Sequence, residues 1–140
     1  MRVLVDTNVI IDALTSREPW NQYAEKIFIM AANRNLDMYI TASSATDICY
    51  LVRKYLHSTE QAKQVMGKLY SLMGILPVTE ADCIDALASA VMDYEDAVIE
   101  RVAAKADMEY IVTRNRKDFQ LGTVKAILPE ELIKLMEQKK

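Results

Sequence analysis

Three polar residues follow the first apolar run of the chain: Asp6, Thr7 and Asn8 come directly after Val3-Leu4-Val5. A continuous apolar run predicts a strand buried on both faces of a parallel sheet, and such sheets bind ligands beyond the carboxyl ends of their strands. The same trio is also common where a helix begins, because its side chains cap the backbone. Whether Asp6 does chemistry therefore depends on whether other carboxylates converge on it.

Two further aspartates lie in the first turns of predicted helices. Asp47 precedes Leu51 by four residues and Asp96 precedes Ile99 by three, so each prolongs an apolar helix face, and we expect both side chains to point toward the sheet. Each also has a structural explanation. Asp47 completes a capping-box pattern with Ser44, and Asp96 complements the helix dipole.

A fourth carboxylate, Asp118, follows a strand predicted to end at Thr113. Phe119 can anchor this loop in the core and hold Asp118 and Asn115 at the top of the sheet, although Asn115 also fits as the cap of a short helical turn. Neighbouring parallel strands would place Asp6 and Thr113 side by side. The loop also contains three candidate contacts for backbone phosphates, with surface solvation as the alternative for each: Arg114, Arg116 and Lys117.

Carboxylates within several ångströms of one another raise each other's pKa unless a cation lies between them. Mg²⁺ or Mn²⁺ is the expected cation, because both prefer oxygen ligands and keep water for a phosphate-bearing substrate. Such a metal lowers the pKa of bound water, polarises the phosphoryl oxygen and, with a second ion about 4 Å away, stabilises the leaving oxygen. The cluster therefore indicates phosphodiester or phosphoryl hydrolysis, which needs neither histidine nor a covalent nucleophile.

Apolar runs alternate with amphipathic segments, which predicts an α/β fold with a parallel sheet covered on both faces. We expect strands at 3–5, 38–41, 75–78, 110–113 and 124–127, and helices at 7–14, 20–33, 45–56, 59–73, 79–91, 96–106 and 129–138. Pro77 places the third strand at an edge. The helix after Thr79 is expected to bury a stripe of Ile84, Leu87, Ala88 and Val91. The helices between Ser43 and Met73 predict a helical arm beside the sheet.

Length and composition fit one compact domain, since the chain has 140 residues, of which 51% are hydrophobic and 26% charged. The net charge of -3 argues against broad attraction to nucleic acid or anionic membrane, so a nucleic-acid partner would be held by local cations. His57 is the only histidine, which excludes histidine-pair catalysis. The two cysteines have no metal-binding spacing, and neither a leader nor a long apolar span is present, so we expect a cytoplasmic protein without membrane contact.

The order and spacing of these motifs resemble the PIN-domain family of metal-dependent ribonucleases, whose bacterial members are commonly toxins of toxin–antitoxin pairs. The resemblance covers nearly the whole chain, through V-D-T-N-V-I-I-D at 5–12, an acid early in the third helix, D-Y-E-D-A at 93–97 and I-V-T-R-N-R-K-D-F at 111–119. It implies a single domain, 1–140, with a three-layer α/β/α sandwich around a five-stranded parallel sheet, usually dimeric. It also implies an acidic cluster of Asp6, Asp47, Asp96 and Asp118, surrounded by Asn8, Thr113 and Asn115.

Two positions depart from the family pattern. The family usually has Glu where this chain has Asp47, and the side chain of Asp47 is one methylene shorter, so we expect it to reach a metal through water. Many members have Asp where this chain has Asn115, and a neutral amide there weakens the binding of a second ion. We therefore expect the first metal position to be stronger than the second.

The leading hypothesis is a Mg²⁺- or Mn²⁺-dependent endoribonuclease that hydrolyses RNA by metal-activated water and is held in check by a small antitoxin. A degenerate domain that binds RNA or protein without cleavage is the alternative, favoured by Asp47 and Asn115. A phosphatase with Asp6 as its nucleophile is a third hypothesis, but that scheme requires a second acid at the position of Asn8.

Overall fold

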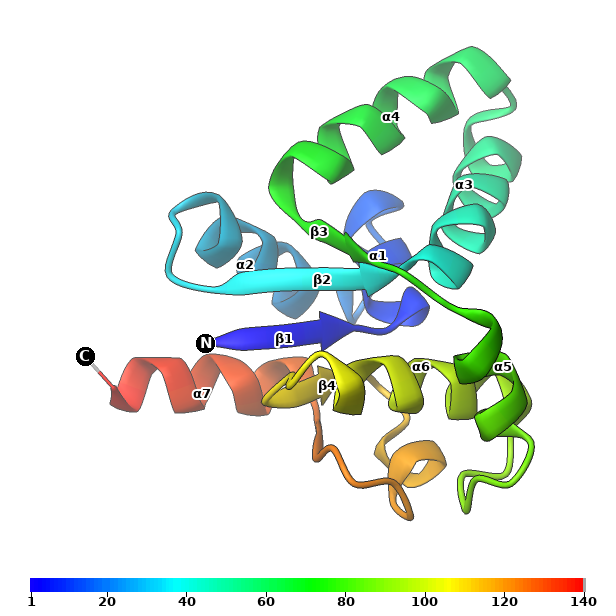
Figure 1. Ribbon diagram of the computed structural model, residues 1–140. Helices are drawn as coiled ribbons and strands as arrows, with labels where there is room; N and C mark the ends of the chain where they lie inside the picture. Colours follow the sequence, from blue (N-terminus) through cyan, green and yellow to red (C-terminus); the bar gives the residue numbers. More distant parts are fainter. Residues whose placement is uncertain (140) are drawn as a thin grey trace.

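A parallel sheet lies between two layers of helices in the computed structural model, which describes residues 1–139 (Figure 1). Within this range the strands are β1 Arg2–Val5, β2 Asp37–Thr41, β3 Gly74–Leu76, β4 Tyr110–Val112 and β5 Ala126–Ile127. The strand order is β3-β2-β1-β4-β5 and every neighbouring pair is parallel. The helices are α1 Thr7–Leu14, α2 Asn21–Ala32, α3 Ala42–Leu56, α4 Thr59–Leu72, α5 Glu80–Ala86, α6 Tyr94–Lys105 and α7 Pro129–Gln138, with a 3₁₀ helix, η1, at Arg116–Phe119. The predicted fold class and the edge position of β3 are confirmed.

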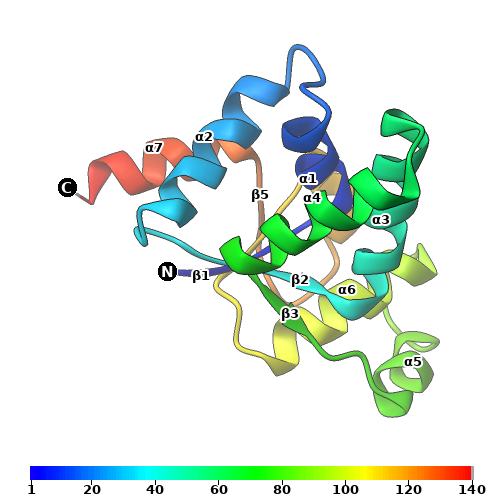
Figure 2. The same cartoon turned by 90° about the horizontal axis from the view of Figure 1, so that it is seen from above.

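The central strand β1 is apolar on both of its faces. Val3 and Val5 belong to the core that packs against α1, α2, α3, α4 and α7, whereas Leu4 belongs to the core formed with α5, α6 and η1. All three side chains are completely buried, as expected for a strand covered on both sides. Figure 2 shows the sheet between these two helical layers.

Polar residues follow β1, β2 and β4 at a shared edge of the sheet. Asp6 caps α1 after β1, and Thr41, the last residue of β2, caps α3 by accepting a hydrogen bond from the backbone N–H of Ser44. The register pairs Val5 with Val112, so Asp6 and Thr113 come next to each other, as predicted. The first turn of a helix and the end of a neighbouring strand thus supply groups to the same edge.

Helices α3 and α4 form the predicted arm, which extends beyond the sheet (Figure 1). His57 ends α3 in the left-handed region with φ 58°, and the Ser58 hydroxyl then caps α4. The inner faces of the arm contribute to the larger core through Ile48 and Val52 on α3 and Met66 on α4. The arm therefore packs into the core on the side of the sheet that α1 covers.

The predicted buried stripe of α5 is wrong at Ile84, Leu87 and Ala88, whereas Val91, beyond the end of the helix, is buried as expected. Ile84 is 58% exposed and Leu87 is 76% exposed, whereas Asp82 and Ala86 are buried. Asp82 completes a capping box with Thr79 and accepts a hydrogen bond of 2.6 Å from Lys105 on α6, and these contacts turn the Asp82 side of the helix inward. The helix also stops at Ala86 instead of continuing to residue 91.

Two helices begin earlier than predicted because capping residues precede the expected starts. Thr41 caps α3, which begins at Ala42, and the Asp93 carboxylate accepts a hydrogen bond from the backbone N–H of Asp96, so α6 begins at Tyr94. The last strand is shorter than predicted and consists of Ala126–Ile127 alone. Across residues 1–139, none of the helices combines the length and the apolar character needed to span a membrane.

Candidate active site

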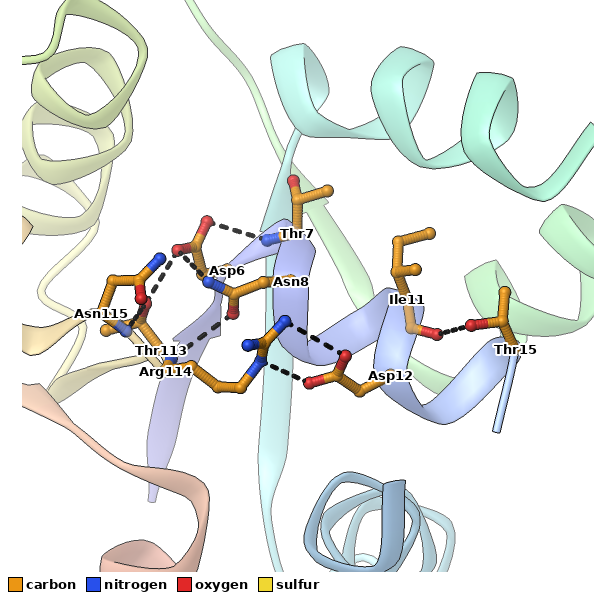
Figure 3. Close-up of polar contacts among 9 residues, drawn as sticks. All are labelled: Asp6, Thr7, Asn8, Ile11, Asp12, Thr15, Thr113, Arg114 and Asn115. Atoms are coloured by element: carbon orange, nitrogen blue, oxygen red, sulfur yellow. Dashed lines mark hydrogen bonds and ion pairs between the residues drawn. The ribbon is translucent and has the colours of Figure 1, made fainter. Parts of the chain in front are cut away.

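Asp6 lies at the buried centre of the candidate site and is 8% exposed. Its Oδ1 accepts a hydrogen bond of 2.8 Å from the Thr7 backbone, and its Oδ2 accepts bonds from Thr113 Oγ1 at 2.9 Å and Asn8 Nδ2 at 3.4 Å (Figure 3). Burial raises the pKa of Asp6, the Thr113 and Thr7 hydrogen bonds oppose this shift, and the charge of Asp118 raises the pKa further. The carboxylate is thus held in one orientation by donors from β4 and α1.

An open cavity of about 610 Å³ lies beside Asp6. Three of the four predicted carboxylates line it, namely Asp6, Asp47 from α3 and Asp96 from α6. Ser43, Ser44 and Glu95 add polar groups to the same walls. Residues that are far apart in the sequence therefore share one solvent-accessible space at the carboxyl edge of the sheet.

Asp96 has a pKa raised to about 7. Partial burial is the main cause, and the negative charges of Asp6, Asp93 and Asp118 raise it further. Because surrounding acids contribute to this raised pKa, a cation in the cavity would stabilise the charged form of Asp96. The electrostatics of the cavity therefore favour a positively charged ligand.

Asp47 and Asp118 occupy more exposed positions than Asp6 and Asp96. The expectation that Asp47 extends a buried helix face is wrong, because Ile48 and Val52 face the core while Asp47 and the 37% exposed Leu51 face the cavity. Asp118 lies in η1, which the buried Phe119 anchors as predicted. Asp118 does not line the cavity, but its charge raises the pKa of both Asp6 and Asp96.

This donor set has the chemistry that Mg²⁺ or Mn²⁺ requires, because it consists of carboxylate oxygens whose mutual repulsion a divalent ion would relieve. Asp6 and Asp96 would hold the ion from opposite parts of the chain, with Asp47 and Asp118 nearby. Within residues 1–139, no three His, Cys, Asp or Glu side chains are close enough to form a complete metal cage. The arrangement is an open acidic cavity, which leaves room for water and a substrate phosphate.

The predicted polar residues connect the turn after β4 to Asp6. Thr113 is completely buried, and its hydroxyl oxygen also accepts a hydrogen bond of 3.0 Å from the backbone N–H of Asn115. Asn8 Oδ1 accepts a bond of 3.4 Å from the backbone N–H of Arg114 (Figure 3). The Asn115 side chain makes no capping hydrogen bond to η1, so the capping role considered for it is not observed.

Two of the three basic residues of this turn are engaged by acids. Arg114 Nε lies 2.7 Å from Asp12 Oδ2, and Arg116 Nη1 lies 3.0 Å from Glu131 Oε1 on α7. Lys117 makes no ion pair with any residue that the structure describes. It lines a second cavity, of about 560 Å³, together with Arg116 and Lys125.

Three residues near the site were missed by the sequence analysis. Glu95 lines the acidic cavity one position before Asp96, and its signal was the run of acids at 93–96. Asp12 is 1% exposed within the apolar run of α1, where a buried acid requires a partner, and Trp20 lies against that partner, Arg114. The sequence does not indicate which basic residue pairs with Asp12.

The PIN domain family profile matches residues 2–117, and the chain belongs to this family. Family membership accounts for the fold and for the acidic edge of the sheet, since PIN domains are typically nucleases that use divalent metals. No curated protein matches the chain.

Solved structures of toxins share the fold. A toxin–antitoxin complex from Klebsiella pneumoniae matches with a TM-score of 0.66 and 22% identity, covering 91% of this chain and 97% of that chain. VapBC2 from Rickettsia felis, bound to a DNA fragment from its promoter, matches with a TM-score of 0.66 and 18% identity over 91% and 98% of the chains. VapC20 from Mycobacterium tuberculosis, a toxin that cleaves the sarcin-ricin loop, matches with a TM-score of 0.61 and 14% identity over 78% and 86%. At these identities the likeness shows the fold alone.

Proposed function

We propose that the chain, as a single domain in the cytoplasm, is a Mg²⁺- or Mn²⁺-dependent endoribonuclease that hydrolyses phosphodiester bonds in RNA. The observation that carries this proposal is the convergence of Asp6, Asp47 and Asp96 on one open cavity, with the charge of Asp118 acting on two of them. Membership of the PIN domain family supports nuclease chemistry.

Each acidic residue has a distinct part in this proposal. Asp6 is held by hydrogen bonds from Thr113 and Thr7, so it would offer a carboxylate oxygen in a constant direction. A cation bound beside Asp96 would favour its ionised form against the burial that raises its pKa. A bound divalent ion supplies the activation of water and the neutralisation of phosphate charge. Asp47 lines the same cavity and is exposed to solvent, so it would contact water and substrate there.

The RNA backbone would be held by cations on the rim of the site. Lys117 precedes Asp118 and makes no ion pair with the described residues, and Lys125 lines the same neighbouring cavity. Phosphate contacts of this kind position a nucleic acid without reading its sequence. Arg114 and Arg116 are less suited to this role, because each already pairs with an acid.

The proposed partners are a small antitoxin protein and a second copy of the chain. The Klebsiella pneumoniae protein of the same fold was crystallised as a toxin–antitoxin complex, which supports an antitoxin. Large apolar side chains are exposed at Ile84 on α5 and at Leu87 and Met92 in the segment between α5 and α6, and Met92 is 91% exposed. Such side chains are common in protein–protein interfaces and support self-association.

The direct test is incubation of the purified protein with end-labelled RNA in Mg²⁺, Mn²⁺ or EDTA. Cleavage is expected with either metal and is lost in EDTA, and Asp96→Asn abolishes it with the fold intact, because the substitution removes a ligand and relieves repulsion. Asp37→Asn, an exposed change at the start of β2, is the matched control and keeps full activity. Cleavage by Asp96→Asn at the wild-type rate would contradict the proposal.

A binding module that does not cleave RNA is the second candidate. It is favoured by the exposed position of Asp47 and by the neutral Asn115 at a position where many relatives have an acid. RNA retention without cleavage in every metal would favour this candidate. Phosphorylation of Asp6 by a phosphate ester would instead favour the phosphatase hypothesis, although Asn8 donates a hydrogen bond to Asp6 and offers no second acid.

A further inference from the structure

Arg114 extends away from the acidic cavity and reaches Asp12 and Trp20, and we call these three residues the Arg114 cluster. The guanidinium carbon lies 4.0 Å from the centroid of the Trp20 ring, and Nη2 lies 3.4 Å from Asp12 Oδ1. Nε is 2.7 Å from Asp12 Oδ2, but its N–H is not aligned on an acceptor, so this contact is chiefly electrostatic. Figure 3 shows the side chain running along α1 from the turn that follows β4.

The burial of Asp12 makes this pairing costly to break. Asp12 is 1% exposed, and burial raises its pKa while the charge of Arg114 lowers it. A buried carboxylate that loses its ion-pair partner is strongly destabilised, so the side chain of Arg114 is held against Asp12. The aromatic face of Trp20 supports the same position through a cation–π contact. This arrangement does not suit a residue that grips an external phosphate.

The backbone N–H of Arg114 takes part in the chain of hydrogen bonds that orients Asp6. Its N–H donates to Asn8 Oδ1 over 3.4 Å, and Asn8 Nδ2 donates to Asp6 Oδ2 over 3.4 Å. Both bonds are long and individually weak, so the position of Asn8 depends on how firmly the turn is held against α1. The Arg114 cluster provides that attachment, because Asp12 lies on the same helix as Asn8.

We propose that Arg114 is a positioning residue, which ties the turn after β4 to α1 through Asp12 and Trp20 and so fixes Asn8 and Asp6 for catalysis. The catalytic part of this inference rests on the proposed ribonuclease function, whereas the attachment itself does not. This role differs from the one that the position of Arg114 in the basic turn suggests, which is contact with a phosphate.

Steady-state kinetics with RNA separate the two roles. Arg114→Lys keeps the charge but cannot contact both Asp12 and Trp20. Asp12→Asn removes the ion pair at a residue that does not touch substrate. Each variant should lower kcat about tenfold to a hundredfold and leave KM and its salt dependence unchanged. The double variant should lower kcat no further than the more impaired single variant, because both substitutions disrupt the same ion pair. A change in KM and salt dependence with constant kcat would assign Arg114 to phosphate binding and overturn the proposal.

Hydrogen exchange tests the attachment independently of cleavage. In Arg114→Lys and in Asp12→Asn, the amides of Arg114 and Asn115 should exchange at least about tenfold faster, whereas the sheet amide of Asp6 keeps its protection. Arg101→Lys is the matched control, since Arg101 also pairs with a buried aspartate, Asp82, and it should change neither exchange at the turn nor kcat. If the two variants exchange the amides of Arg114 and Asn115 at the wild-type rate, the proposal is overturned, even if the wild type cleaves RNA. If the variants exchange these amides faster but the wild type does not cleave RNA, only the ribonuclease function is refuted.

Discussion

Asp6 and Asp96 border the same cavity but differ in how their charge is supported. Asp6 accepts hydrogen bonds from Thr7, Asn8 and Thr113, which stabilise its ionised form against burial. Among the described residues Asp96 has no comparable set of donors, and partial burial together with neighbouring acids raises its pKa to about 7. The site therefore combines one carboxylate fixed by hydrogen bonds with one whose charged form a bound cation would stabilise.

The raised pKa of Asp96 predicts how stability depends on pH without metal. The folded protein holds this proton up to about pH 7, whereas the unfolded chain releases it near 3.8, so unfolding becomes easier as pH rises between these values. Asp96→Asn should therefore gain stability over the wild type as pH is raised from about 5 to about 8 in EDTA. Thermal denaturation followed by circular dichroism measures this difference. A constant difference across the range would show that Asp96 does not titrate in this way.

The short side chain of Asp47 predicts a gain from Asp47→Glu. The extra methylene lets the carboxylate extend farther into the cavity that Asp47 borders from α3. We expect the Mg²⁺ concentration for half-maximal cleavage to fall by about tenfold, the size typical of changes close to a metal site. Glu60→Asp, a change of the opposite sense in the first turn of α4, is the control and should leave this concentration unchanged. A higher Mg²⁺ requirement in Asp47→Glu would mean that the cavity has no room for the longer side chain.

At the scale of the elements, the ends of the strands were predictable and the orientation of some helices was not. Asp6 and Thr113 could be placed side by side because apolar runs and parallel pairing determine where neighbouring strands end. The face of α5 could not be predicted, because it is set by a contact between Asp82 and Lys105 that lie in different helices. The partner of Asp12 was missed for the same reason, since charge pairs between distant segments leave no periodic pattern.

Helix α6 holds the segment that follows η1 through one buried carboxylate. Glu100, which is 7% exposed, accepts hydrogen bonds from the backbone N–H groups of Thr123 and Val124 and from the Thr123 hydroxyl. A Cβ at Gly122 would lie 2.7 Å from Glu100 Cδ, so only glycine permits this approach. The contact ties the chain after Asp118 to the helix that contains Asp96.

Loss of this contact should destabilise the protein measurably. Glu100→Gln places an amide N–H against a backbone donor, and we expect the free energy of unfolding in urea to fall by about 2 kcal/mol. Glu109→Gln changes an exposed side chain with one long hydrogen bond and should stay within about 0.5 kcal/mol of the wild type. Equal effects of the two substitutions would indicate that Glu100 does not hold the segment.

At the scale of the whole molecule, the net charge of -3 limits how RNA can associate. A negatively charged surface repels the RNA backbone, so association depends on a few local cations and its salt dependence should be shallow. Lys117 is the foremost candidate because it directly precedes Asp118 and no described residue pairs with it.

The contribution of Lys117 can be measured in the Asp96→Asn background, in which RNA is expected to remain uncut. Lys117→Ala should make the slope of log Kd against log salt concentration shallower by about 0.7, the value for one phosphate contact on a single strand. Lys63→Ala on the exposed side of α4 is the matched loss of charge and should leave the slope unchanged. An equal slope for the wild type and Lys117→Ala would place the RNA elsewhere.

The Arg114 cluster also gives the protein an intrinsic optical reporter. Trp20 is the only tryptophan in the chain, and it is 40% exposed with the Arg114 guanidinium against its ring. Its fluorescence therefore senses the turn that leads to Asn115 and Asp118, without any added dye. Emission spectra recorded during a titration with Mg²⁺ or RNA would follow the movements of that turn in the unmodified protein.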